Sequence, residues 1–319
     1  MTERVGRTPD GPRQATASSP TPGGVLVIDK PAGPTSFDVV ARVRRLLHAD
    51  KAGHTGTLDP LATGVLVVCL GDAVKLQQFL CEGDKEYRAT IAFGAATTTE
   101  DGAGEIVARG DPSGLEPDSI RRVLARFVGD IEQVPPMYSA VRVNGRRLHE
   151  AARAGEEVQR SARIVRVHSL ELLRAEHVAG DFRVEVAVRC GKGTYIRTLG
   201  VDLGRAVGVP AHLAALVRTQ AGPFRLDEAI TLDEAERLAS SDRATLLRRV
   251  LPLEGALRGW PLVHLPVLEA RDLVHGRAVT RDGVPSGLCG ALDPAGRLVA
   301  VCEGRVGVLQ PVRVLRSSR

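Results

Sequence analysis

Residues 53–64 read GHTGTLDPLATG and form the most unusual local sequence of the 319-residue chain. Glycines in such a loop allow a ligand or a second backbone to approach closely. The single carboxylate, Asp59, precedes Pro60, and a residue before proline is restricted to extended conformations. A carboxylate with a restricted backbone in an otherwise free loop is suited to act as a nucleophile or base. The alternative is that Asp59 caps a helix or forms an Asx turn.

Apolar patterns around this loop predict both strands and helices. The predicted strands are 25–28, 65–70, 87–93 and a pair, 165–173 and 182–188, joined by a turn. The predicted helices follow Ser36, a good N-cap, and Pro117, and also cover 74–80 and 196–207. Because no regular strand–helix–strand rhythm connects them, the predicted fold class is α+β with a mixed sheet.

Sequence texture divides the chain into three regions. Residues 1–22 carry four prolines and no periodic apolar residues, which predicts a disordered tail that is not a secretory leader. Residues 23–260 hold the mixed elements. From Leu262 onward short strands alternate with Gly and Pro turns, which predicts a small β-rich C-terminal domain over 261–319.

Composition limits the functional classes. Apolar residues make up 43% and charged residues 25%, as in ordinary globular proteins, and no apolar run approaches the length of a membrane span. The five cysteines form no C-x-x-C pair, and the eight histidines form no cluster with them. We therefore expect a cytoplasmic protein without a disulfide framework or a metal site.

The net charge of +5 permits a polyanionic partner without requiring one. Positive charge is concentrated in Val141–Arg166, where seven arginines face three glutamates around an Asn144-Gly145 turn. Such a basic, turn-centred excursion fits contacts with RNA phosphates, and it equally fits a solvated surface of mixed charge.

Aromatic residues are scarce, at 3%, yet all three tyrosines lie in dense mixed patches: Tyr87, Tyr138 and Tyr195. A tyrosine ring can stack on a flipped base, and it can equally pack in a core or an interface.

Together these segments resemble the bacterial tRNA pseudouridine-55 synthase family, TruB. The matching motifs are GVLVIDKPAGPTS (24–36), GHTGTLDPLATG (53–64), KEYR (85–88), VPPMYSA (134–140) and GTYIRT (193–198). The resemblance covers roughly 24–260 and is weaker in the C-terminal part, which resembles a PUA-type RNA-binding domain. It implies a pseudouridine-synthase catalytic domain with a mixed β-sheet and flanking helices, followed by a PUA-like domain.

The resemblance also implies a reaction, the isomerisation of uridine-55 in the T loop of tRNA to pseudouridine. This reaction needs neither cofactor nor metal, and the implied partner is the T arm of tRNA. We expect no membrane association, no obligatory protein partner and a monomer.

Site residues follow by resemblance. Asp59 is implied to be the essential aspartate, which adds covalently to the nucleotide or takes a ribose proton. Tyr87 would stack on the flipped uracil and assist proton removal at C5, and Arg197 would pair with Asp59. Tyr195 would line the same pocket. His54 would fill the space that the flipped base leaves in the RNA, or simply hydrogen-bond within the loop.

Further RNA contacts are implied for Lys30, which could instead support the fold, and for a basic insertion, about 134–166, that grips the T loop. Its candidate residues are Arg142, Arg146 and Arg147. The chain departs from the family pattern at Thr98, where the family usually has an acid, and at His149, where it usually has tyrosine. The alternative functions are a non-catalytic tRNA-binding or tRNA-folding protein and a guide-RNA-dependent synthase.

Overall fold

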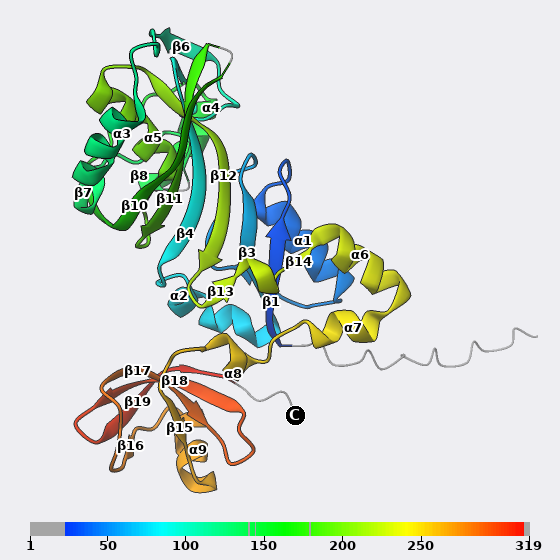
Figure 1. Ribbon diagram of the computed structural model, residues 1–319. Coiled ribbons are helices and arrows are strands. Elements are labelled where there is room, and N and C mark those ends of the chain that lie inside the picture. The colour runs from blue at the N-terminus through cyan, green and yellow to red at the C-terminus, as the bar shows by residue number, and fades with distance from the viewer. Residues whose placement is uncertain (1–22, 140, 144, 179, 316–319) are drawn as a thin grey trace, which may run out of the picture.

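The computed structural model describes residues 23–315 except 140, 144 and 179, so the predicted tail 1–22 lies outside the described residues. Within the described part, a mixed ten-stranded sheet runs through the larger domain and a five-stranded sheet forms the C-terminal domain. Figure 1 shows helices at both ends of the large sheet and the smaller domain beside its lower end. The predicted α+β class with a small β-rich C-terminal domain is confirmed.

The large sheet follows the order β14-β1-β3-β12-β4-β11-β10-β7, with β2 on β3 and β13 on β12. Its neighbours are antiparallel except for the parallel pairs β1·β14 and β3·β12. The strands are β1 Gly24–Lys30, β2 Ala52–His54, β3 Thr63–Leu70, β4 Lys85–Phe93, β7 Gly129–Gln133, β10 Arg163–Val178, β11 Asp181–Cys190, β12 Ala211–Ala221, β13 Phe224–Arg225 and β14 Ile230–Thr231.

The remaining strands form smaller sheets. They are β5 Ala95–Thr97 with β6 Ile106–Arg109, β8 Arg142–Val143 with β9 Arg146–Arg147, and, in the C-terminal sheet, β15 Leu262–His264, β16 Val279–Thr280, β17 Gly287–Leu292, β18 Leu298–Arg305 and β19 Val308–Val314.

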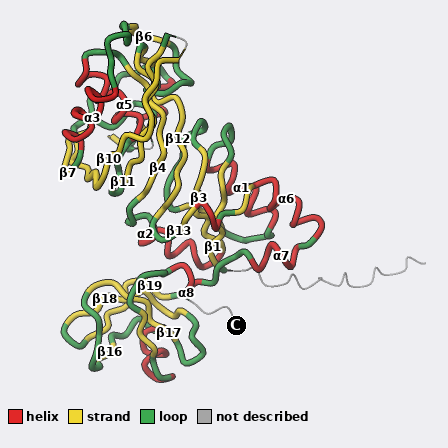
Figure 2. The backbone as a smooth tube through the Cα atoms, viewed as in Figure 1, coloured by secondary structure: helices red, strands yellow, loops and turns green. Residues whose placement is uncertain are grey.

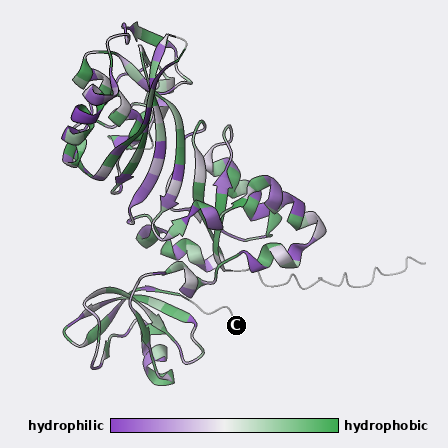
Figure 3. Cartoon of the chain, in the orientation of Figure 1, coloured by the Kyte–Doolittle hydropathy of each residue, from purple (hydrophilic) through white to green (hydrophobic). Residues whose placement is uncertain are grey.

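The helices, red in Figure 2, gather at the flanks of the sheets. They are α1 Ser36–Leu46, η1 Gly71–Leu76, α2 Gln77–Leu80, α3 Pro117–Leu124, η2 Ala125–Phe127, α4 Leu148–Arg153, α5 Ile196–Val207, η3 Leu226–Glu228, α6 Leu232–Ser241, α7 Arg243–Arg248, α8 Leu253–Ala256 and α9 Val267–Val274. Figure 3 shows hydrophobic and hydrophilic residues mixed along them, as expected for helices that cover one face of a sheet.

The predicted start of α1 is wrong by one residue. Thr35, not Ser36, is the N-cap: its hydroxyl accepts a hydrogen bond from the Asp38 N–H at 3.1 Å, and the Asp38 carboxylate accepts one from the Thr35 N–H at 3.0 Å. This reciprocal capping box satisfies two backbone donors that a cap at Ser36 would leave open. The predicted helix 74–80 is a 3₁₀ turn followed by one turn of α-helix.

The sheet is continuous, but its hydrophobic core is divided into separate clusters. One cluster packs β4, β11, β10 and β12 against α3 and α5, and another packs β1 and β3 against α1, α6 and α7. A third joins the larger domain to the C-terminal domain, where Val25 and Leu76 share a cluster with Leu292 and Val301. The Phe79 and Trp260 rings add an edge-to-face contact there. The cluster with α3 and α5 and the cluster with α1, α6 and α7 therefore cover neighbouring parts of one sheet, in which β3 pairs with β12.

Candidate active site

The loop between β2 and β3 carries Asp59, and hydrogen bonds to Leu58, the residue before Asp59, hold this loop in place. The Ser36 hydroxyl donates to the Leu58 carbonyl at 2.9 Å and accepts from the Leu58 N–H at 2.8 Å. After Asp59, its carbonyl accepts from the Ala62 N–H at 3.0 Å, which closes a tight turn over Pro60. The backbone on both sides of the carboxylate is thus tied to the fold.

Two buried cations hold this loop from beneath. Lys30 is fully buried, and its ammonium donates to the carbonyls of Ala62 at 2.7 Å and Pro31 at 2.8 Å. Arg218, 2% exposed, donates to the carbonyls of Val65, Gly56 and Thr57 at 2.7, 3.0 and 3.3 Å. Burial lowers the pKa of Lys30 to about 8. These contacts describe a fold-supporting lysine, and its contact with RNA stays a prediction.

Gly64, the last residue of the loop motif, must be glycine because the backbone of Arg218 approaches it closely. Gly64 has φ +97°, and a Cβ there would lie 2.2 Å from the Arg218 carbonyl oxygen. Any side chain would therefore push β12 away from β3, where Arg218 pairs with Gly64.

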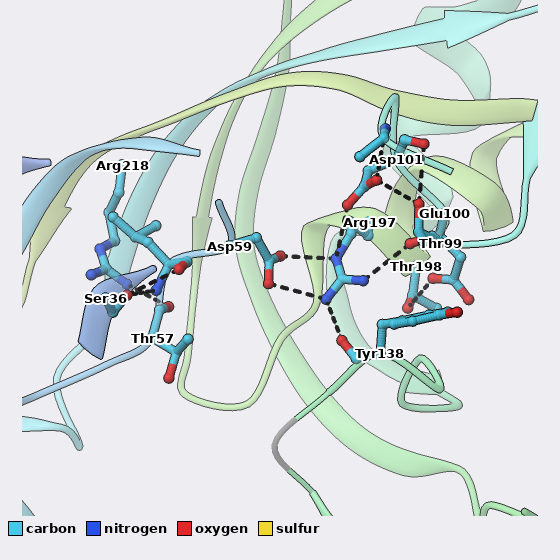
Figure 4. A network of polar contacts seen from close by, with 12 residues as sticks. Ser36, Thr57, Asp59, Thr99, Glu100, Asp101, Tyr138, Arg197, Thr198 and Arg218 are labelled. Carbon is cyan, nitrogen blue, oxygen red and sulfur yellow. Dashed lines mark hydrogen bonds and ion pairs between the residues drawn. The ribbon is translucent and has the colours of Figure 1, made fainter. Parts of the chain in front are cut away.

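Asp59 meets Arg197 in a two-point ion pair, shown in Figure 4. The Arg197 Nε lies 2.9 Å from Asp59 Oδ2, and its Nη2 lies 3.2 Å from Oδ1. The arginine side chain is 4% exposed and that of the aspartate 32%, so the carboxylate is presented outward by a buried guanidinium. Arg197 lies in the first turn of α5, whose Ile196 and Leu199 pack in the same hydrophobic cluster as Leu58 and Ala62.

The other donors of Arg197 bind backbone carbonyls. Nη1 donates to the Thr99 carbonyl at 3.0 Å and Nη2 to the Tyr138 carbonyl at 2.8 Å. The Asp101 carboxylate lies 4.0 Å from Nε and is itself held by the Thr99 hydroxyl at 2.6 Å. Sequence reasoning missed these partners. Asp101, two residues after Thr99, is an acid that the sequence itself displays, but a backbone carbonyl has no residue signature.

Burial raises the pKa of Asp59, and the Arg197 guanidinium opposes this shift. The neighbouring carboxylate of Asp101 adds to the increase, whereas the Lys30 ammonium works against it. Asp59 thus holds a proton at higher pH than an exposed aspartate does.

Two of the predicted site residues, Tyr87 and His54, lie close to Arg218, and Tyr195 lies two residues before Arg197 in the chain. Tyr87 lies opposite Arg218 in the β4·β12 register, and burial raises the pKa of its phenol, which is therefore protonated at neutral pH. Tyr195 is partly exposed and is the residue before α5. Burial lowers the pKa of His54, the last residue of β2, with Arg218 as the second cause. A hydrogen bond with the backbone of Gly56 opposes this decrease in the pKa.

A basic cleft of about 580 Å³ begins at His54 and reaches the C-terminal domain. Its charged lining comes from Lys51, Lys75, Asp72 and, from the C-terminal domain, Arg313. In the described part of the chain, no group of three His, Cys, Asp or Glu side chains is placed to hold a metal ion. No described helix is long and apolar enough to cross a membrane.

Comparison with known families accounts for almost the whole described chain. The family model described as "TruB family pseudouridylate synthase (N terminal domain)" matches residues 44–196. Two C-terminal models, "tRNA pseudouridylate synthase B C-terminal domain" and "tRNA Pseudouridine synthase II, C terminal", match 197–258 and 260–316. This chain belongs to the TruB family.

Relatives in this family are similar over more than nine-tenths of their length. The tRNA pseudouridine synthase B of Ralstonia nicotianae is 44% identical, with 92% of this chain and 94% of the relative aligned. That of Aromatoleum aromaticum is 47% identical, with 92% of each chain aligned. Among solved structures, a chain of a Cbf5-Nop10-Gar1 complex has a TM-score of 0.69 at 29% identity, covering 92% of this chain and 85% of that chain. The predicted membership of TruB is confirmed.

The basic insertion of this TruB protein contains the β8·β9 hairpin and α4. Arg142 donates to the Gly145 carbonyl at 2.8 Å, and Arg146 pairs with Glu156 at 2.9 Å. None of these contacts reaches Asp59, so the structure does not bring these predicted RNA-binding residues to the carboxylate. The Arg147 side chain lies outside the described residues.

Proposed function

We propose that this TruB protein isomerises uridine to pseudouridine at position 55, in the T loop of tRNA. The observation that carries the proposal is the Asp59 carboxylate, which is held bidentately by buried Arg197 while a third of its side chain stays exposed. The relatives named tRNA pseudouridine synthase B support tRNA as the substrate.

The reaction breaks the C1′–N1 bond of an extruded uridine and joins C1′ to C5. The C5 proton leaves and N1 is protonated, so the nucleotide composition is unchanged and no redox partner is consumed. Asp59 either adds covalently to the nucleotide or takes a ribose proton to begin the cleavage. Arg197 favours the ionised, oriented carboxylate against the effect of burial.

The remaining site residues act on the base and the RNA. Tyr87 stacks on the flipped uracil and assists proton removal at C5, and Tyr195 lines the same pocket. His54 fills the place of the extruded base, and its neutral imidazole suits a stacked environment. Because His54 ends β2, just before the Asp59 loop, and also lines the basic cleft, it links the loop to that cleft.

RNA is bound by the basic cleft, the insertion and the C-terminal domain. We assign 23–260 to the catalytic domain and 261–319 to a PUA-like RNA-binding domain. We further propose that the protein acts as a monomer in the cytoplasm and needs no obligatory protein partner.

The decisive experiment is tritium release from C5-tritiated uridine in unmodified tRNA, comparing wild type with Asp59→Asn. Release by purified wild type alone, on naked tRNA, supports the enzyme and assigns the chemistry to Asp59. A folded wild type that binds tRNA without releasing tritium would favour a tRNA-binding or tRNA-folding protein. Release only after addition of a guide RNA and partner proteins would favour the guide-dependent alternative.

A further inference from the structure

The buried side chain of Gln133 forms a two-way hydrogen-bond pair with the backbone of Tyr195. Gln133 is the last residue of β7 and is 2% exposed. Its Oε1 accepts from the Tyr195 N–H at 3.0 Å, and its Nε2 donates to the Tyr195 carbonyl at 3.2 Å. One amide thus supplies the two hydrogen bonds that a paired strand residue would supply.

The pair lies where α5 begins. Tyr195 is the N-cap of α5 and has no side-chain capping bond, and its carbonyl also accepts from the Leu199 N–H at 3.0 Å. Since the first turn of a helix lacks internal partners for its N–H groups, its direction depends on such external contacts. Arg197 lies in that first turn, two residues beyond the pair.

A second contact joins the same two segments. Five residues after Gln133, the Tyr138 carbonyl accepts from Arg197 Nη2 at 2.8 Å. Residues 133–138 form the N-terminal root of the basic insertion, and the first and last residues of this root, Gln133 and Tyr138, both contact residues 195–197. That short stretch supplies Tyr195 and Arg197 to the site.

We propose that Gln133 is a positioning residue that fixes the start of α5, so that Arg197 holds the Asp59 carboxylate in place. Through the same contact, Gln133 couples the Asp59–Arg197 ion pair to the root of the insertion. This inference rests on the proposed function and deepens it. Gln133 does not touch the reacting atoms, and it acts through the backbone of Tyr195. An ångström of misplacement in a site of this kind costs about 100-fold in rate, so a contact this far from the chemistry can matter.

The test uses a carboxyl as a titratable copy of the amide. In Gln133→Glu, a protonated carboxyl accepts from the Tyr195 N–H and donates to the Tyr195 carbonyl, as the amide does. An ionised carboxylate instead turns a second acceptor toward that carbonyl. We expect the single-turnover rate on tRNA to lie within about threefold of wild type near pH 5.5 and to fall about tenfold or more below it near pH 8.5. Affinity for tRNA should change less than about threefold.

Two further variants separate positioning from loss of fold. Gln133→Met has a similar length and no hydrogen bonds, so its rate should be low at every pH. Gln220→Glu is the matched control, because the Gln220 amide also donates to a backbone carbonyl, that of Gly222, at 2.9 Å. Its rate should follow wild type across the pH range. A Gln133→Glu rate that parallels wild type at all pH values, or a fully active Gln133→Met, would overturn the proposal.

Hydrogen exchange gives a readout that does not need activity. The amides of Tyr195 and Leu199 should exchange faster in Gln133→Met than in wild type, and in Gln133→Glu only at high pH. Unchanged protection at these amides would contradict the positioning role even if wild type proved inactive. An inactive wild type with the expected exchange pattern would instead refute the proposed function and leave the contact intact.

Discussion

The Asp59 carboxylate and the Arg197 guanidinium lie 138 residues apart in the chain and meet at 2.9 and 3.2 Å. We expect Asp59→Asn to abolish tritium release, because the amide is neither a nucleophile nor a base, while tRNA affinity stays within about tenfold of wild type. Filter binding and tritium release from one preparation check both values. A loss of binding of several hundredfold would mean that Asp59 is structural rather than catalytic.

Replacing the guanidinium should affect chemistry more than binding. In Arg197→Lys the charge remains, but one ammonium cannot bind both carboxylate oxygens together with the Thr99 and Tyr138 carbonyls. We expect kcat to fall about 100-fold with little change in KM. Arg205→Lys is the matched control, because Arg205 is on the same helix and is exposed in a pair with Asp202. Equal losses in the two variants would show that a general effect on α5, and not the ion pair, lowers the rate.

Local sequence was sufficient to predict the part of the site that is continuous in the chain. The 53–64 motif predicts a restricted Asp59, and the resemblance to TruB adds Arg197. The carbonyls that hold Arg197 could not be predicted, since any residue type can supply one and they come from 98 and 59 residues away. Arg218 was missed for the same reason: it looks like an ordinary basic residue until its distance from Gly56 is known.

At the start of α1, by contrast, the local sequence contains the capping signal, although it points to Thr35 and not to Ser36. Thr35 and Ser36 are both good N-caps, but only Thr35 has an acid three residues later, at Asp38. Ser36 is thereby released to bind Leu58, the residue before Asp59. A choice between two adjacent caps thus decides which hydroxyl is available to the site.

The acid limb of the rate should lie above the range of an ordinary aspartate. Because burial raises the pKa of Asp59 from 3.8, the active carboxylate is lost as pH falls through that raised value. Asp101→Asn removes a like charge that contributes to the increase, so we expect its acid limb to shift to lower pH. Single-turnover rates between about pH 4 and about pH 7 report the limb position whatever the maximal rate. An unmoved limb in Asp101→Asn would exclude this electrostatic coupling.

Lys30 should make stability depend on alkaline pH. Its pKa is about 8 when folded, against 10.5 for an unperturbed lysine, so between these values the unfolded chain binds more protons. The free energy of unfolding of wild type, relative to Lys30→Met, should therefore rise with pH across this window, by about 3 kcal/mol in all. Below about pH 7 the difference should be constant, because Lys30 is then charged in both the folded and the unfolded state. Urea titrations at several pH values measure this difference in the free energy of unfolding. If the difference does not change between the two pKa values, burial does not destabilise the Lys30 ammonium.

The insertion should contribute to RNA affinity through charge alone. Arg142 and Arg146 are exposed, and Arg146 is only partly neutralised by Glu156. The double variant Arg142→Gln/Arg146→Gln should bind tRNA more weakly, and the slope of log K against log salt should decrease by about 1.4–1.8, as expected for two lost phosphate contacts. Arg121→Gln/Arg122→Gln, on α3, is the charge-matched control and should leave the slope unchanged. If both double variants reduce the slope equally, the protein binds tRNA through diffuse positive charge, and the insertion is not a specific tRNA-binding site. If only the insertion pair does so while the single-turnover rate at saturating enzyme is preserved, binding by the insertion and chemistry at Asp59 are separable.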